Sequence, residues 1–368
     1  MKIVYIITKA DEIGGAQIHV RDLSIAMTQL GHQVTVIVGE TGALTEQLEN
    51  NGINYIVESK LIRNISPLKD IICTIKLRSI LKQLSPDIVS LHSSKAGIIG
   101  RSALIGTKIP CIFTAHGWAF ADGVSDQRKK FYIFIEKLFS KFCNNIVTVS
   151  HQDKNLAVKY NVAPSEKQIV IHNGMPDKTI DFPRKNEPSD TVNIICVARF
   201  SEQKDHISLL KSLTTIDTLN WTLNLVGKDP LESEVKMLAE QLNISSKINF
   251  LGERHDVSKL LSSSDLFILP SNWEGLPRSI IEAMSFSLPI IASDVGGVSE
   301  MVSHSNGFLI PRGDIEKMSN ALKTLIENKD TRIQMGKSSR EIYCNGFNFQ
   351  QMLDNTHHLY RQISGKHS

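Results

Sequence analysis

The 368-residue chain lacks the features that mark secreted, membrane-spanning and nucleic-acid-binding proteins. Its five cysteines form no Cys-x-x-Cys pair and stand in apolar stretches, as buried thiols do in a reducing compartment. The first apolar run, residues 3–7, is too short for a signal peptide or a membrane span. Its 41 lysines and arginines nearly balance 38 aspartates and glutamates, which disfavours general phosphate neutralisation. We therefore expect a cytoplasmic protein that binds no nucleic acid.

What the chain does contain is a long series of short apolar, β-branched runs. Most are uninterrupted, which indicates strands covered on both faces in a parallel sheet, with helices between them. The length favours two domains of roughly 150 residues each. The predicted strands are residues 3–7, 34–38, 88–91, 112–114, 146–149 and 169–171, then 192–197, 223–226, 248–251, 266–269, 289–292 and 308–310. The fold class is therefore α/β, with two Rossmann-like domains.

Helix signals and a proline-rich stretch divide this series. A helix is predicted over residues 17–30, ending at Gly31, and Ser66 and Pro67 predict an N-cap and first position of another. Residues 175–192 contain three prolines and no apolar periodicity, so they are predicted to link domain 1–174 to domain 193–346. Two parallel sheets whose carboxyl ends face a central cleft would share one site.

Two basic stretches lie in the first half, residues 60–82 and 128–141. In the second, Phe131, Phe134, Ile135, Leu138 and Phe142 recur at helical spacing behind a cluster of basic side chains at residues 128–130. A basic, aromatic helix suits an anionic membrane surface. The same pattern also fits an ordinary helix that turns its apolar face to the core and its charges to solvent. Both interpretations stay open at this stage.

The most specific segment is residues 265–300, which begins DLFILPSNWEGLPRSIIEAM. A strand is followed by a polar loop and then by a helix predicted to begin near Arg278. Glu274 stands on the loop and Glu282 one turn into the helix, so both can face one ligand. The backbone N–H groups at the helix start suit an anion, and Gly275 permits close approach. The segment predicts a phosphate site flanked by two carboxylates.

Carboxylates repel phosphates, so these two are better suited to sugar or ribose hydroxyls. The segment ARFSEQK supplies cations instead, with Arg199 just after a predicted strand and Lys204 five positions later. Both could stabilise the negative charge of a departing diphosphate. Ordinary surface charge in a loop is the alternative.

These residues together resemble retaining glycosyltransferase family 4, which has the GT-B fold. The resemblance rests on EGLPRSIIE with the preceding DLFILPS, on ARFSEQK, on the turn at residues 172–174 and on GGAQ at residues 14–17. It covers nearly the whole chain in the expected order. It implies that the first domain binds the acceptor, the second binds a nucleotide-sugar, and the C-terminal helix within residues 347–368 returns to the first domain.

The resemblance also implies roles for single residues. In the second domain, Arg199 and Lys204 would hold the donor diphosphate, Glu282 the ribose, and Glu274 hydroxyls of the transferred sugar. The backbone amides of Gly275, Leu276 and Pro277 would face the diphosphate.

In the first domain, the resemblance implies that Gly14 and Gly15 lie near the diphosphate and the acceptor. His116, in TAHGW after a predicted strand, matches the family histidine near the donor sugar and would serve both acceptor binding and catalysis. A histidine at a strand end can also be a simple polar cap.

Neither a cofactor nor a metal is expected. Positive charge develops at the anomeric carbon and negative charge on the leaving phosphate, so cationic side chains could replace a metal ion. The sequence has no Asp-x-Asp element and no cysteine–histidine cluster with zinc spacing. Retention would follow from front-face attack assisted by the leaving phosphate, or from a covalent intermediate on Glu274. The sequence leaves both mechanisms open.

The segments TKADEIGGAQIHV and TAHGWAF look closest to bacterial enzymes that build O-antigen, capsule or lipopolysaccharide. The implied donor is UDP-hexose or UDP-N-acetylhexosamine, and the implied acceptor a saccharide on polyprenyl diphosphate at the anionic inner face of the cytoplasmic membrane. A UDP-N-acetylglucosamine 2-epimerase and a non-catalytic nucleotide-sugar sensor are the alternatives. A NAD-dependent dehydrogenase is disfavoured, because residues 11–16 do not form Gly-x-Gly-x-x-Gly.

Overall fold

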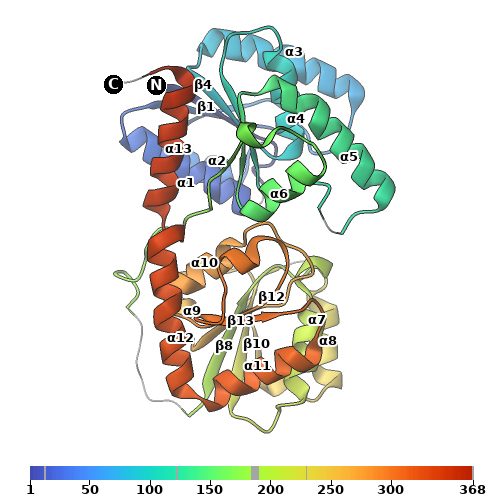
Figure 1. The fold of residues 1–368 in the computed structure, drawn as a ribbon, viewed down its shortest axis with the longest axis vertical. Coiled ribbons are helices and arrows are strands. Elements are labelled where there is room, and N and C mark those ends of the chain that lie inside the picture. The colour runs from blue at the N-terminus through green and yellow to red at the C-terminus, as the bar shows by residue number, and fades with distance from the viewer. Residues whose placement is uncertain (12–13, 122, 184–189, 229, 367–368) are drawn as a thin grey trace. The chain divides into compact units, whose positions relative to one another are not determined.

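The computed structural model describes residues 1–11, 14–121, 123–183, 190–228 and 230–366. The chain divides into two compact units (Figure 1). The first contains Met1–Asn173 and Gln351–Ser368, and the second contains Gly174–Gln350. Among the described residues, no helix combines the length and the apolar character needed to cross a membrane.

The first unit is built on a seven-stranded parallel sheet in the order β3-β2-β1-β4-β5-β6-β7. Five consecutive buried residues, from Ile3 to Ile7, place β1 in the middle of this sheet. Its strands are β1 (Lys2–Ile7), β2 (Gln33–Val38), β3 (Asn54–Val57), β4 (Ile88–His92), β5 (Cys111–Ala115), β6 (Asn145–Thr148) and β7 (Gln168–Val170). Its helices are α1 (Gly15–Gln29), α2 (Ala43–Asn50), α3 (Pro67–Leu84), α4 (Ser94–Leu104), α5 (Asp126–Phe139), α6 (His151–Lys159) and most of α13 (Phe349–Ser364).

The second unit has a six-stranded parallel sheet in the order β10-β9-β8-β11-β12-β13. Its strands are β8 (Val192–Val197), β9 (Trp221–Val226), β10 (Ile248–Phe250), β11 (Leu266–Leu269), β12 (Ile290–Ser293) and β13 (Gly307–Ile310). Its helices are α7 (His206–Thr214), α8 (Glu232–Gln241), α9 (Val257–Ser262), α10 (Arg278–Ser285), α11 (Ile315–Glu327) and α12 (Lys329–Ile342), with short helical turns η3 (Glu202–Lys204), η5 (Gly296–Glu300) and η6 (Tyr343–Phe347).

The predicted α/β class is confirmed, and each predicted strand run coincides with a strand of one of the two parallel sheets. One strand, β3, was missed. It lies at the edge of its sheet and buries none of its residues fully, so its sequence shows no continuous apolar run.

The predicted end of α1 and the predicted start of α3 both agree with the structure. Helix α1 ends one residue before Leu30, and Gly31 follows with φ +83°, a conformation that favours glycine. Pro67 begins α3 as predicted, but the Ser66 side chain makes no capping bond. Ser66 is the N-cap residue of α3, as predicted, and its N–H donates to the Asp70 carboxylate at 3.2 Å.

Part of the stretch predicted as a linker is held within the second unit. Met175 pairs with Asn348 in an isolated bridge and receives a hydrogen bond from the Tyr343 hydroxyl at 2.9 Å. Asp177 forms an ion pair with Arg340 of α12, which lowers the pKa of that carboxyl to about 2. Residues 184–189 of the stretch lie outside the described residues.

Four of the five cysteines are buried, as expected, while Cys344 is exposed in η6. Burial raises the pKa of the Cys73 and Cys196 thiols to about 12, so both remain protonated. The prediction that all five are buried is wrong for Cys344, because the turn that carries it lies at the surface.

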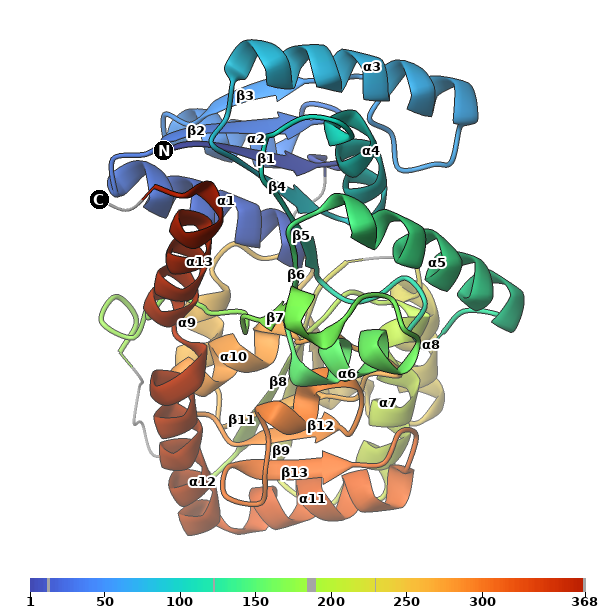
Figure 2. The ribbon, with the colours of Figure 1, turned by 45° about the horizontal axis from the view of Figure 1, so that its top comes forward.

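The core-facing interpretation of the basic, aromatic helix is wrong for most of its apolar side chains. Helix α3 packs on α4, and α4 on α5, beside the first sheet (Figure 2). Phe131 is 51% and Phe134 63% exposed on α5, and Leu138 is also exposed. The α5 residues that face the core are Tyr132, Ile133 and the buried Glu136, whose carboxylate pairs with Arg101 at 2.8 Å.

Helix α3 exposes a second apolar stripe. Leu68 is 78% exposed, and the exposed Ile71, Ile72 and Ile75 follow it at helical spacing. The opposite side of α3 packs Cys73, Leu77 and Leu81 into the core. A helix that is apolar on its solvent side as well as its core side presents a surface for another apolar phase or partner.

Candidate active site

In the second unit, the predicted donor residues gather where the strand order reverses. Strand β8 lies between β9 and β11, and the chain leaves β8 in one direction and returns through β11 on its other side. Such a reversal leaves a crevice at the carboxyl ends of the two strands, where open α/β sheets bind ligands. Arg199 and Lys204 follow β8, and Glu274 follows β11.

Lys204 and Glu274 form an ion pair across this reversal. Their side chains are 14% and 7% exposed, so the pair is largely shielded from water. The same Glu274 Oε1 accepts a hydrogen bond from the Ser271 hydroxyl at 2.6 Å. The family resemblance implied that Lys204 and Glu274 contact different parts of a ligand, whereas in the structure the two side chains contact each other.

Hydrogen bonds to backbone carbonyls fix the two loops to each other. The Gln203 side-chain amide donates to the Trp273 carbonyl at 2.8 Å, and the Gln203 backbone carbonyl accepts from the Asn272 N–H at 2.7 Å. Asn272 also donates from its side chain to the Glu202 carbonyl at 2.7 Å. The positions of Lys204 and Glu274 are therefore set by several hydrogen bonds besides their own ion pair.

Gly296 supports the same loop and was missed in the sequence analysis. Its φ is +56°, and a Cβ there would lie 2.0 Å from the Glu274 carbonyl oxygen. Its neighbour Gly297 donates its N–H to the Gly275 carbonyl at 2.7 Å. The signal in the sequence is the Gly-Gly pair shortly after a predicted strand, a position where backbone often approaches backbone closely.

Helix α10 begins at Arg278, as predicted, directly after Pro277. Glu282 lies one turn in, is half-buried, and accepts a hydrogen bond from the Ser258 hydroxyl at 3.2 Å. Burial raises the pKa of the Glu282 carboxyl, an effect opposed by the nearby Lys178, Ser258 and Arg278. The half-buried Gly275 and the buried Leu276 precede Pro277 at the start of this helix.

Arg199 is exposed on the loop after β8. This loop is backed by Gly227, whose Cβ, if present, would lie 2.0 Å from the Ala198 carbonyl oxygen. A cavity of about 330 Å³ opens beside it, lined by Ser201, Asp205, His206 and Asn272 among others, and by none of the predicted donor residues. The cavity therefore does not define the donor site.

In the first unit, the predicted residues lie at the corresponding reversal between β1 and β4. Gly14 precedes α1 and accepts the first helical hydrogen bond, from the Ile18 N–H at 3.0 Å, and Gly15 is the first residue of the helix. Residues 12 and 13 of the preceding loop lie outside the described residues. His116 follows β5, the neighbour of β4, and is half-buried.

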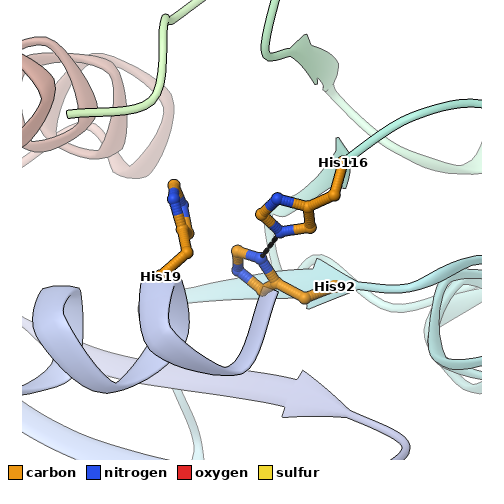
Figure 3. A group of neighbouring side chains, drawn as sticks. All are labelled: His19, His92 and His116. Carbon is orange, nitrogen blue, oxygen red and sulfur yellow. Dashed lines mark hydrogen bonds between the residues drawn. The ribbon is translucent and has the colours of Figure 1, made fainter. Parts of the chain in front are cut away.

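His116 has histidine neighbours that the sequence analysis missed (Figure 3). Its Nε2 lies 2.9 Å from Nδ1 of His92, the last residue of β4, and His92 Nε2 lies 2.9 Å from the Ser90 hydroxyl. His19 of α1 approaches His116 edge-on, with ring centroids 4.8 Å apart. His116 is therefore part of a buried polar cluster and more than a strand cap. His92 stands at a predicted strand end, which is the signal that could have pointed to it.

Comparison with known proteins decides the family. The model described as "Glycosyltransferase Family 4" matches residues 13–178, and that described as "Glycosyl transferases group 1" matches residues 177–342. An Escherichia coli UDP-Gal:alpha-D-GlcNAc-diphosphoundecaprenol alpha-1,3-galactosyltransferase is 32% identical over 343 residues, 89% of this chain and 88% of that protein. The chain belongs to the family 4 glycosyltransferases. The resemblance stated from the sequence is thus confirmed.

One further relative supports the same family, and one solved structure has the same fold. The O-antigen biosynthesis glycosyltransferase WbnH of Escherichia coli is 30% identical over 307 residues, 83% of this chain and 85% of that protein. The solved structure of Anabaena Alr3699/HepE with UDP and glucose superposes with a TM-score of 0.84 at 21% identity, covering 98% and 99% of the two chains. The second comparison supports the fold alone.

Proposed function

We propose that this glycosyltransferase moves a hexose or N-acetylhexosamine from a UDP-sugar to a saccharide carried on polyprenyl diphosphate, in bacterial surface polysaccharide biosynthesis. The reaction retains the anomeric configuration and needs no metal ion or cofactor. The observation that carries the proposal is the Lys204–Glu274 pair, which places a cation and a carboxylate together at the strand-order reversal of the second unit. The name of the 32%-identical E. coli relative supports the donor and acceptor classes.

Each donor-binding role follows from the charge and position of its residue. Arg199 and Lys204 bind the diphosphate, together with the backbone N–H groups of Gly275 and Leu276 just before α10, whereas Pro277 has no N–H to donate. Glu282, half-buried one turn into this helix, accepts hydrogen bonds from the ribose hydroxyls. This arrangement separates the cationic part of the site from the carboxylate that reads the nucleoside.

The chemical step requires charge stabilisation on the leaving group. The bond between the anomeric carbon and the β-phosphate oxygen breaks, its electron pair goes to the phosphate, and the anomeric carbon becomes electron-poor. Lys204 and Arg199 stabilise the developing phosphate charge, as preorganised donors do in other group-transfer enzymes. This cationic pair fills the role that a divalent metal has in other nucleotide-sugar enzymes.

Glu274 acts on the sugar by binding its hydroxyls. Its Oε1 already accepts bonds from Lys204 and from Ser271, which reduces the electron density available for nucleophilic attack. The contacts therefore favour front-face attack over a covalent glycosyl-enzyme on Glu274. The acceptor hydroxyl then attacks on the face that the phosphate leaves and passes its proton to that phosphate.

The acceptor belongs to the first unit. Gly14, Gly15 and His116 lie at its own strand-order reversal and bind the acceptor saccharide, His116 by a ring nitrogen. The exposed apolar stripes of α3 and α5 are interspersed with exposed lysines such as Lys69 and Lys130. Apolar side chains flanked by cations suit an anionic bilayer, so this surface holds the enzyme peripherally at the inner face of the cytoplasmic membrane, where a polyprenyl-linked acceptor is found.

The test is sugar transfer followed by mass spectrometry. UDP-galactose, UDP-glucose and their N-acetyl forms, with GDP- and ADP-sugars as controls, are offered with synthetic polyprenyl-diphosphate GlcNAc and GalNAc in the presence of EDTA. We expect one UDP-sugar to add a single residue to one acceptor. Tight binding of UDP without transfer to any acceptor would instead support a non-catalytic sensor.

A further inference from the structure

We propose that His19, His92 and His116 form a binding site for a divalent transition-metal ion, through which such an ion inhibits the enzyme. The three side chains come from α1, β4 and the turn after β5, and each offers one ring nitrogen, all within 4.8 Å of one another (Figure 3). The binding part of this proposal stands on the cluster itself, and the inhibitory part rests on the acceptor role proposed for His116.

The fold holds these rings close together for a simple reason. His92 is the last residue of β4, which pairs with β1 through Ile7 and with β5 through Thr114. Helix α1 follows β1 and turns His19 toward the same edge of the sheet. His19 is 4% exposed and His92 is fully buried, so neither side chain is free to move into solvent.

The ligand chemistry selects a borderline metal. Imidazole nitrogens suit Zn²⁺, Co²⁺, Ni²⁺ and Cu²⁺, whereas Mg²⁺ and Ca²⁺ prefer oxygen ligands. Three histidines leave a fourth tetrahedral position for water or for a substrate hydroxyl.

A tetrahedral metal ion fits between the three histidine rings after small movements of their side chains. With metal–nitrogen bonds of about 2.0–2.1 Å, two ligands of a tetrahedral ion lie roughly 3.3 Å apart. The His92 Nδ1–His116 Nε2 pair is now at 2.9 Å, so these rings must separate slightly while His19 moves in. A neutral His116 can carry its proton on Nδ1 when Nε2 binds the ion, so no net proton is released.

The Ser90 hydroxyl acts as the outer partner of the site. At 2.9 Å from His92 Nε2, it can accept the N–H of that nitrogen and so leave the lone pair of Nδ1 facing His116. Histidine ligands in metal sites usually donate their second nitrogen in this way, which fixes the ring. Ser90 is fully buried, so water does not compete for this bond.

The binding experiment uses the full chain without a histidine tag. Co²⁺ is titrated and followed by its visible absorption, and Zn²⁺ by calorimetry, for the wild type and for His92→Gln and His116→Gln. Thermal unfolding of each variant checks that it folds. The matched control is His357→Gln, because His357 Nε2 lies 2.8 Å from His32 Nε2 in a second histidine pair of the same unit.

We expect one Co²⁺ or Zn²⁺ per chain, at least tenfold weaker binding in folded His92→Gln and His116→Gln, and no change in His357→Gln. Ser90→Ala, which keeps all three ligands, should weaken binding several-fold, and Mg²⁺ should give no signal. Unchanged metal affinity in both ligand variants, or its loss in His357→Gln, would overturn the proposal.

A separate readout tests the inhibition. If the enzyme transfers sugar in EDTA, added Zn²⁺ should stop transfer and renewed EDTA should restore it, with little inhibition in His92→Gln. Zn²⁺ that binds the three histidines without slowing transfer would remove the inhibitory role and contradict the placement of His116 at the acceptor. The binding titration is valid even if no donor or acceptor supports transfer.

Discussion

At the scale of single residues, the account depends most on the pair formed by Lys204 and Glu274. Both side chains are mostly withdrawn from water, and the Glu274 carboxylate also accepts from Ser271. Removing one partner of a shielded ion pair leaves the other uncompensated, which costs more than the pair itself contributes. The two residues should therefore be coupled in stability as well as in catalysis.

A double-mutant cycle tests this coupling. Lys204→Met and Glu274→Gln should each lower the free energy of unfolding, and the double variant should lose less than the sum, with a coupling of about 1–3 kcal/mol. Denaturant unfolding of the four proteins measures it. Simple additivity would mean that the two side chains do not interact in solution.

In transfer assays, Glu274→Gln should reduce kcat by roughly 10²–10³-fold while UDP binds with little change, since Glu274 is assigned to the sugar. Lys204→Met should mainly lower kcat as well. Calorimetry measures the UDP affinity of each variant and the transfer assay measures its kcat, so a loss of binding is distinguished from a loss of rate. Loss of UDP binding in Glu274→Gln, with the fold intact, would contradict the sugar-side assignment.

We expect the charged Glu282 side chain to favour UDP binding and to lower the free energy of unfolding. Because burial raises the pKa of its carboxyl in the folded state, the folded chain takes up this proton more readily than the unfolded chain. The charged form thus lowers stability at neutral pH, and this loss disappears as the pH falls through the raised pKa. Glu282→Gln should therefore be more stable than the wild type at pH 7 but bind UDP at least tenfold more weakly.

Unfolding curves at pH 5 and pH 7, together with UDP titrations, check both parts of this prediction. The stability difference between Glu282→Gln and the wild type should shrink at the lower pH. A variant that is less stable at pH 7, or that binds UDP normally, would show that Glu282 is a structural residue.

At the scale of elements, the turn η5 supports the loop that carries Glu274 through Gly296. An alanine there would bring Cβ against the Glu274 carbonyl oxygen and would adopt a left-handed φ of +56°. Gly296→Ala should lower both thermal stability and transfer, the latter by tenfold or more. Gly313→Ala is the matched control, because Gly313 has φ +73° with nothing within 4 Å of its Cβ position.

The control should show only the cost of the left-handed conformation, roughly 1–2 kcal/mol, without a loss of transfer. Comparing the two variants by thermal unfolding and by the transfer assay therefore isolates the close contact with the loop. Equal effects on transfer would mean that Gly296 matters only for its backbone angle.

The exposed stripes of α3 and α5 make a prediction about membranes. Serine at Leu68, Ile71 and Ile75 of α3, or at Phe131 and Phe134 of α5, should reduce sedimentation with vesicles of anionic phospholipid about tenfold or more. Removing Arg128, Lys129 and Lys130 should do the same at low salt, because lysine and arginine near an anionic surface contribute about 1 kcal/mol each.

The matched control places serine at Met237 and Ile333, exposed apolar residues of the second unit. This variant should sediment like the wild type, and all variants should unfold at similar temperatures since the residues are exposed. Unchanged sedimentation of the α3 and α5 variants would contradict the membrane surface.

At the scale of the whole molecule, the sequence predicted the two parallel sheets because buried strands leave continuous apolar runs. It also predicted the start of α10 and the charged residues that follow β8 and β11, since turn chemistry and charge are local properties. It did not predict β3, which is an exposed edge, and it left open whether the apolar stripe of α5 faces the core or a membrane, because helical spacing does not reveal what a stripe faces. The Lys204–Glu274 contact and the histidine cluster depend on strand order, which local pattern does not encode.

Each unit has one strand-order reversal in its sheet. The reversal in the second unit carries cations and carboxylates, for which we propose donor binding, and the reversal in the first unit carries glycines and histidines, for which we propose acceptor binding. We propose that both reversals act in one retaining, metal-independent transfer from a UDP-sugar to a lipid-linked saccharide. The most direct measurement is nuclear magnetic resonance of the product formed from an α-linked UDP-sugar and polyprenyl-diphosphate GlcNAc with EDTA present. We expect one new α-linked sugar on the acceptor with the wild type and none with Glu274→Gln. A β-linked product, or transfer that EDTA abolishes, would contradict the proposal.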